Sequence, residues 1–156
     1  MNYRYLYRAK RIDNGEWILG SLIQTSYLGS IRSWISSEQE DKARLREISS
    51  NQAVWRAFEV RTDTICQCTG LKDKNGKLIW ENDICRRILL PTKRIETNFR
   101  IAYVPYKCCL SAIDLDGSNV TFLSDYINNK YEVEVIGNIF DNKELLESED
   151  KNESNY

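Results

Sequence analysis

Two closely spaced turns limit what this chain can fold into. The stretch 68–85 reads Cys-Thr-Gly-Leu-Lys-Asp-Lys-Asn-Gly-Lys-Leu-Ile-Trp-Glu-Asn-Asp-Ile-Cys. Lys74-Asn75-Gly76 predicts a tight polar turn, because Asn and Gly tolerate the positive φ that such turns require. A short strand at 77–80, a second turn at 81–83 and a strand from Ile84 complete the pattern. This alternation of strand and turn predicts the start of a small β-barrel, and it carries no catalytic chemistry.

The N-terminal residues predict a hairpin. From Tyr3 to Arg8 aromatic residues occupy every second position, which is the pattern of a strand with one face buried. Asp13-Asn14-Gly15 then supplies residues suited to a turn, and 16–23 is again rich in β-favouring side chains. Two such runs joined by Asn-Gly are the strongest short-range signal of a β-hairpin.

From residue 26 to residue 51 the pattern is weaker. Ile31, Trp34 and Ile35 fit either a strand or a loop. A capping-box pattern favours one marginal helix at 38–48, and a polar excursion loop fits the same residues equally well.

Beyond Ile84 the sequence predicts more short strands joined by turns. Pro91 ends one of them, because proline cannot donate to a sheet ladder. The segment 114–119 predicts the turn of a second hairpin, and Gly137 interrupts the last strand. The predicted elements are strands at 99–104, 108–113, 120–122 and 131–140, a helical turn at 123–127, and a short helix at 141–147 capped by Asn142.

Composition excludes several classes of function. The chain has 22 Lys and Arg against 23 Asp and Glu, so as a whole it is not a polycation made for nucleic acid. It has no histidine, which removes the Ser-His-Asp triad, the Cys-His pair and the imidazole metal ligand. No complete cofactor motif is present, and we expect neither a cofactor nor catalysis.

The cysteines and the N-terminus indicate the cytoplasm. The 5 cysteines are odd in number and lack the regular spacing of a secreted disulfide framework, so we expect free thiols. No apolar run approaches the ~20 residues that a membrane helix needs. No signal-peptide pattern follows Met1. These features predict a cytoplasmic protein with no membrane partner.

Four segments of the chain match a known pattern. Together they resemble the YopX family of phage and prophage proteins, as a Bacteroides-type member. The resemblance spans about 3–147 and leaves 26–57 unmatched. The segments are 7–17 (Tyr-Arg-Ala-Lys-Arg-Ile-Asp-Asn-Gly-Glu-Trp), 67–77 (Gln-Cys-Thr-Gly-Leu-Lys-Asp-Lys-Asn-Gly-Lys), 79–84 (Ile-Trp-Glu-Asn-Asp-Ile) and 132–142 (Glu-Val-Glu-Val-Ile-Gly-Asn-Ile-Phe-Asp-Asn).

The resemblance implies a fold but no reaction, because the family has no established biochemical activity. It implies a mainly β (α+β) chain with an N-terminal hairpin and irregular α+β region at 1–66. A small SH3-like β-barrel at 67–142 would follow. From the residues themselves we expect a short helix and a disordered acidic tail at 143–156. Asn82 stands where the family usually has Gly. We expect the turn to survive, because Asn tolerates left-handed geometry best after Gly.

A basic stretch is a candidate nucleic-acid surface. Residues 86–107 interleave cations with aromatic rings, and cationic strands that carry aromatics bind single strands by phosphate contact and base stacking. The alternative, which we favour, is a solvated sheet face whose charges prevent wrong edge pairing. The candidate residues are Arg86, Arg87, Arg94, Arg100, Tyr103, Tyr106 and Lys107.

An aromatic stripe at the N-terminus is a candidate interface. Tyr3, Tyr5 and Tyr7 would share one strand face, with Trp17 on the neighbouring strand. Such a stripe packs a hairpin face or forms a homo-oligomer contact, where Tyr and Trp are enriched. Both interpretations stay open.

Two motifs resemble metal sites in part. Cys66-x-Cys68 could begin a zinc chelate, but Cys108 and Cys109 would point to opposite faces of a strand. The segment 114–118, Asp-Leu-Asp-Gly-Ser, resembles a calcium loop without the glutamate at its twelfth position. Free thiols and an ordinary turn are the simpler interpretations, and we expect no metal.

These observations predict a non-enzymatic accessory protein of phage or prophage origin. It would act by binding a host or phage protein or by forming a homo-oligomer. The alternative is a nucleic-acid-binding module that uses residues 86–107. A third class, a hydrolase or transferase, would need one pocket with raised pKa values at two or more turn carboxylates. The carboxylates in question are Asp73, Glu81, Asp83 and Asp114.

Overall fold

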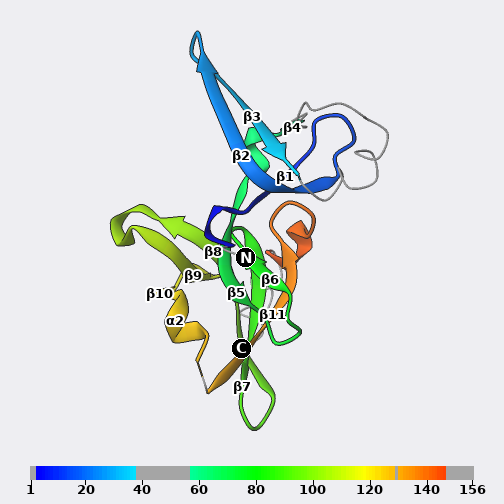
Figure 1. The fold of residues 1–156 in the computed structure, drawn as a ribbon. Helices are drawn as coiled ribbons and strands as arrows, with labels where there is room; N and C mark the ends of the chain where they lie inside the picture. The colour runs from blue at the N-terminus through cyan, green and yellow to red at the C-terminus, as the bar shows by residue number, and fades with distance from the viewer. Residues whose placement is uncertain (1–2, 38–56, 129, 147–156) are drawn as a thin grey trace. The chain divides into compact units, whose positions relative to one another are not determined.

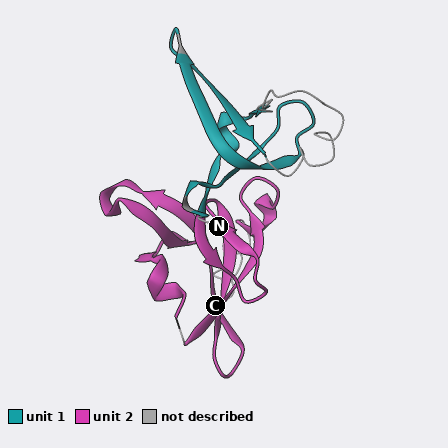
Figure 2. Cartoon of the chain, viewed as in Figure 1, with its two compact units in different colours: residues 1–68 teal, residues 69–156 magenta. Residues whose placement is uncertain are grey.

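A computed structural model describes residues 3–37, 57–128 and 130–146 (Figure 1). The protein is mainly β and has two antiparallel sheets. It divides into two compact units, residues 1–68 and 69–156, which Figure 2 colours teal and magenta. The helix predicted at 38–48 and the tail from 147 onward lie outside the described residues. The three-part division predicted from the sequence stays a prediction.

The predicted N-terminal hairpin is confirmed, with one correction. β1 (Tyr7–Lys10) pairs antiparallel with β2 (Trp17–Tyr27), and Gly15 takes a φ of 74° in the turn between them. The residues before β1 form a 3-10 helix, η1 (Tyr3–Tyr5), closed by a bond from the Leu6 N–H to the Tyr3 carbonyl. The expectation of one strand from Tyr3 was therefore wrong, because the chain closes a helical turn before it extends.

Unit 1 builds its sheet around this hairpin in the order β4-β3-β2-β1-β5. The segment left open between strand and loop is strand β3. Buried side chains on one face of this sheet form its core. The remaining elements are β3 (Ser30–Ser36), β4 (Ala57–Val60), η2 (Thr62–Thr64) and β5 (Cys66–Lys72), and the core residues are Ala9, Ile18, Ile35 and Val60.

Strand β5 continues past residue 68, and β6 (Leu78–Trp80) follows it in the strand order. The second sheet lies in unit 2 and has the order β10-β9-β8-β7-β11. Its strands are β7 (Asp83–Leu89), β8 (Arg94–Val104), β9 (Cys109–Asp114), β10 (Val120–Phe122) and β11 (Tyr131–Asn138). Short helical segments connect or follow them, namely η3 (Pro105–Lys107), α2 (Leu123–Tyr126) and η4 (Lys143–Leu145).

The core of unit 2 lies on one face of the second sheet. The Phe99 and Tyr126 rings meet edge to face, with centroids 4.6 Å apart, so α2 packs onto β8. Such aromatic pairs add stability beyond the area they bury. The buried core residues are Ile79, Cys85, Phe99, Ile101, Ala112, Leu123, Tyr126 and Val133.

Both turns of the central motif are confirmed. Gly76 has a φ of 80° and Asn82 a φ of 65°, so each adopts the left-handed conformation that the sequence predicts. Among the described residues the sheets stay open, since β10 and β11 are the outermost strands of the second sheet. The SH3-like barrel and the α+β character of the N-terminal region stay predictions.

Candidate functional site

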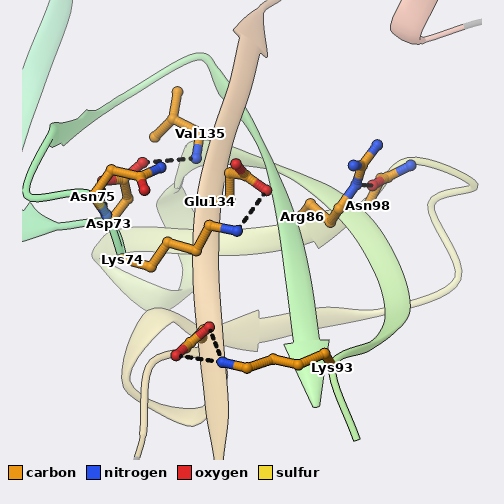
Figure 3. A network of polar contacts seen from close by, with 9 residues as sticks. Asp73, Lys74, Asn75, Arg86, Lys93, Asn98, Glu134 and Val135 are labelled. Carbon is orange, nitrogen blue, oxygen red and sulfur yellow. Dashed lines mark hydrogen bonds and ion pairs between the residues drawn. The ribbon is translucent and has the colours of Figure 1, made fainter. Parts of the chain in front are cut away.

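The turn between β5 and β6 is organised by the buried carboxylate of Asp73. Its Oδ1 accepts the backbone N–H groups of Asn75 at 2.8 Å and Lys77 at 2.9 Å. Its Oδ2 accepts the N–H of Val135 on β11 at 3.2 Å (Figure 3). Burial raises the pKa of Asp73, but these three N–H donors outweigh burial and lower the pKa below its ordinary value.

The same turn covers the outer edge of β11. The Lys74 N–H donates to the Val133 carbonyl at 2.8 Å, and the Lys74 ammonium lies 3.1 Å from Glu134 (Figure 3). Together with the Val135 bond, these contacts satisfy backbone groups that an edge strand would otherwise expose. This part of β11 is therefore closed to an incoming strand.

The second turn is held in a similar way. Asp83 is buried, and its Oδ2 accepts the N–H of Trp80 at 2.9 Å. Asn82 donates its N–H to the Ile101 carbonyl at 2.8 Å and accepts the N–H of Ile139 at 3.1 Å. Two segments of the sequence motif that lie far apart in the chain thus meet in one structural junction.

The cations of the basic stretch do not share one face. Residues paired across strands lie on the same face, and neighbours along a strand lie on opposite faces. Arg86 pairs with Asn98, and Arg100 lies two positions further along β8, so these two arginines share a face. Arg87 pairs with Val133, which belongs to the core of unit 2, and it lies on the other face.

Arg87 is held by its neighbours. Its guanidinium lies 4.3 Å from the centroid of the Tyr126 ring and 4.5 Å from that of Tyr131. It also forms an ion pair with Glu96 at 3.2 Å. An arginine stacked between two aromatic rings and paired with a carboxylate stabilises the fold. It is poorly placed to contact phosphate.

The Tyr126 hydroxyl makes a further polar contact at the rim of this core. It donates to Asp114 Oδ1 at 2.6 Å. Burial, and then the adjacent carboxylate, raise the pKa of Tyr126 to about 12. The hydroxyl is therefore a hydrogen-bond donor at neutral pH.

Other cations near the basic stretch are also engaged. Lys93 pairs with Glu132 at 2.9 Å, and Arg86 makes a long hydrogen bond of 3.5 Å to Asn98 (Figure 3). Lys107 donates to the Val120 carbonyl at 2.7 Å.

Four residues of the basic stretch are more available to contact a nucleic acid than those with partners in the fold. In the part of the chain that the structure describes, no carboxylate forms an ion pair with Arg94 or Arg100. Tyr103 and Tyr106 are 53% and 76% exposed.

The residues of the predicted aromatic interface do not lie on one face of the sheet. Tyr7 packs against the core of unit 1, whereas Trp17 pairs with Lys10 on the other face of the same sheet. The Trp17 ring lies 4.8 Å from the Arg8 guanidinium and 5.5 Å from the Lys10 ammonium. Tyr3 and Tyr5 lie in η1 and do not extend the strand.

The cysteines are free thiols. Cys66, Cys68 and Cys85 are buried, Cys109 is half-buried and Cys108 is exposed. Within residues 3–37, 57–128 and 130–146, no three His, Cys, Asp or Glu side chains gather as they would around a metal ion.

The Asp-Leu-Asp-Gly-Ser segment forms a turn. Gly117 has a φ of 73° and donates its N–H to the Asp114 carbonyl at 2.9 Å. Asp116 accepts the Ser118 N–H at 2.8 Å. Asparagine and aspartate commonly hold turns through such side-chain bonds, which accounts for Asp116. The Asp114 carboxylate instead accepts the Tyr126 hydroxyl.

The aromatic cluster around Arg87 was missed by the sequence reasoning. Glu96, Tyr126 and Tyr131 come from three different elements, and no spacing in the sequence connects them. The one available signal was the period of two in β7, which separates Arg86 from Arg87.

Fold and site together define a mainly β protein of two compact units, whose sequence motifs are built into turns and strand edges. The family model described as YopX protein matches residues 6–147, which is most of the chain. The chain belongs to the YopX family. No curated protein matches the sequence. None of the described helices has the length and apolar character to cross a membrane.

Proposed function

We propose that this protein is a non-enzymatic accessory protein of phage or prophage origin that acts by binding. Its partners are a host or phage protein or further copies of itself, and it works in the cytoplasm. The finer fold that we propose is an irregular α+β N-terminal region followed by an SH3-like barrel at 67–142.

One observation carries this proposal, namely how the turn carboxylates are used. A hydrolase or transferase built on the turn carboxylates would need at least two of them in one pocket with raised pKa values. The pKa of Asp73 is instead lowered, because backbone N–H groups of Val135, Lys77 and Asn75 surround it. Asp83 and Asp114 likewise accept hydrogen bonds from Trp80 and Tyr126. These acids hold the fold, which favours binding over catalysis.

The test combines light scattering of the purified chain with a pull-down from infected or lysogenic host lysate. We expect either a defined oligomer or a stoichiometric protein partner. A chain that is monomeric at all concentrations and captures no protein would overturn the proposal. So would turnover of an ester, phosphoester or glycoside substrate that Asp73→Asn abolishes in a folded variant.

Exposed tyrosines favour a second candidate, the nucleic-acid-binding module. Tyr103 and Tyr106 expose more than half of their surface. Arg94 and Arg100 lie on β8 with Tyr103, and among the described residues no carboxylate forms an ion pair with either arginine. Binding to a single-stranded oligonucleotide should weaken steeply with salt, because phosphate contacts release counterions. A double variant, Arg94→Ala with Arg100→Ala, should weaken it further. No binding at low salt would remove this candidate.

A further inference from the structure

The outer part of the β2–β3 hairpin extends beyond the strands beside it (Figure 1). β1 pairs with β2 only as far as Gly20, opposite Tyr7, and β4 pairs with β3 from Ser33 onward. No other strand that the structure describes lies beside the segment 21–32, which we call the arm. A two-stranded ribbon standing alone is only marginally stable in water, so the arm gains from any further pairing.

The arm lacks the features that normally protect a strand edge. Lys, Pro and bulges keep exposed edges from pairing with other chains. From Ser21 to Ile31 the arm has no charged residue and no proline, in a chain that is 29% charged. Its one charge, Arg32, is held by Glu59 of β4 through bonds of 2.8 and 2.7 Å. Leu28 is 88% exposed and Ile31 is 60% exposed, so apolar surface accompanies the unprotected edge.

The turn of the arm fixes which backbone groups point outward. Leu28 and Gly29 form a two-residue turn and both have positive φ, 47° and 79°. Such a turn is closed by the hydrogen-bonded pair Tyr27 and Ser30. Hydrogen-bonded and non-hydrogen-bonded pairs then alternate along an antiparallel ladder. The N–H and C=O groups of the even-numbered β2 residues 22, 24 and 26 therefore point away from β3.

We propose that this outward edge of β2 pairs with the same edge of a second copy of the chain, antiparallel and centred on Gln24. The inference rests on the proposed self-association and names the surface that performs it. In this arrangement Gln24 lies opposite the partner's Gln24, and Ile23 lies opposite the partner's Thr25. Pairs of β-branched residues are favourable across strands, and no like charges meet.

A second copy fits this edge better than another partner does. Residues 21–31 carry no charge, so two copies of the edge can approach without repulsion. An identical edge supplies the same backbone groups in the reverse direction, and a two-fold axis closes the pair. The contact is small, so we expect a weak dimer whose population depends strongly on concentration.

Charge variants at the two-fold axis test the proposal. Gln24→Lys and Gln24→Glu each place two like charges opposite one another in the dimer. Sedimentation velocity of the full chain should show the dimer dissociation constant rising by roughly tenfold or more for each variant alone. An equimolar mixture of the two variants should recover dimerisation, since opposite charges then face each other. Ser30→Lys adds the same charge to β3, away from the pairing edge, and should leave the dimer intact.

Two results would overturn the proposal that the arm forms the dimer contact. An oligomer that both Gln24 variants leave unchanged would refute pairing through the arm, while the proposed self-association would stand. A wild-type chain that is monomeric at all concentrations, but captures another protein from lysate, would refute dimerisation through the arm. It would leave the proposed binding function in place. Recovery in the mixture separates lost pairing from misfolding, because a misfolded variant would not regain a partner.

Discussion

The Asp73 carboxylate accepts the backbone N–H of Val135, which joins the first turn of the central motif to the last strand of the sheet. The same carboxylate closes its own turn through the N–H groups of Asn75 and Lys77. One side chain therefore fixes both the geometry of the turn and its attachment to β11. The segments 67–77 and 132–142 of the sequence pattern therefore meet in the folded chain.

Asp73→Ala should lower the free energy of unfolding by about 2–4 kcal/mol, because three backbone donors lose a charged acceptor in a buried place. Urea denaturation followed by circular dichroism measures this loss. Asp116→Ala, in an exposed turn, removes an acceptor that water can replace and should cost much less. Equal effects of the two substitutions would show that the bond to β11 adds nothing.

The lowered pKa of Asp73 predicts a pH dependence of stability. The folded state favours the ionised carboxylate, so this contribution is complete above the unfolded pKa of about 3.9 and is lost as the pH falls through the lowered folded-state pKa. Wild type should therefore lose stability relative to Asp73→Asn below about pH 4. Parallel stability curves for the two proteins over this acid range would contradict the assignment.

Local chemistry was enough to predict the turns and most strands. Gly76 and Asn82 have the left-handed backbone that their residue types favour, and the strand at 120–122 lies where the sequence placed it. Alternation failed at Tyr3 and Tyr5, because a period of two does not exclude a short helical turn.

Contacts between distant segments could not be predicted in this way. A period of two shows that Arg86 and Arg87 face opposite sides, but it does not show what covers each side. Arg87 meets Tyr126 and Tyr131 only after β7 has paired with β11 and α2 has docked. Seven residues in one basic stretch therefore suggested a single surface, whereas the sheet divides them.

Tyr126→Phe should lower the free energy of unfolding by about 1–2 kcal/mol, since it removes the 2.6 Å bond to Asp114. The raised pKa has its own consequence. Stability from the neutral hydroxyl is complete below the ordinary pKa of 10.0 and is lost as the pH rises toward about 12. Ultraviolet titration of wild type minus Tyr126→Phe should therefore show one tyrosine ionising near pH 12.

Tyr106→Phe is the matched control for stability, because its ring is exposed. It should leave the urea midpoint unchanged. A difference titration for Tyr126→Phe centred near the ordinary tyrosine value would mean that the hydroxyl is open to water and not held by Asp114.

Gly20 marks the point where β2 leaves β1 and continues beside β3 alone. A Cβ at this position would lie 1.9 Å from the backbone carbonyl oxygen of Ser36, which a side-chain rotation cannot relieve. Gly20→Ala should therefore force the two strands apart and lower the free energy of unfolding by about 1–3 kcal/mol. Ser21→Ala, one residue further along β2 and exposed, should have little effect on the same urea midpoint. If both variants unfold like wild type, the sheet does not require the close approach of β2 and β3 at Gly20, and the prediction is wrong.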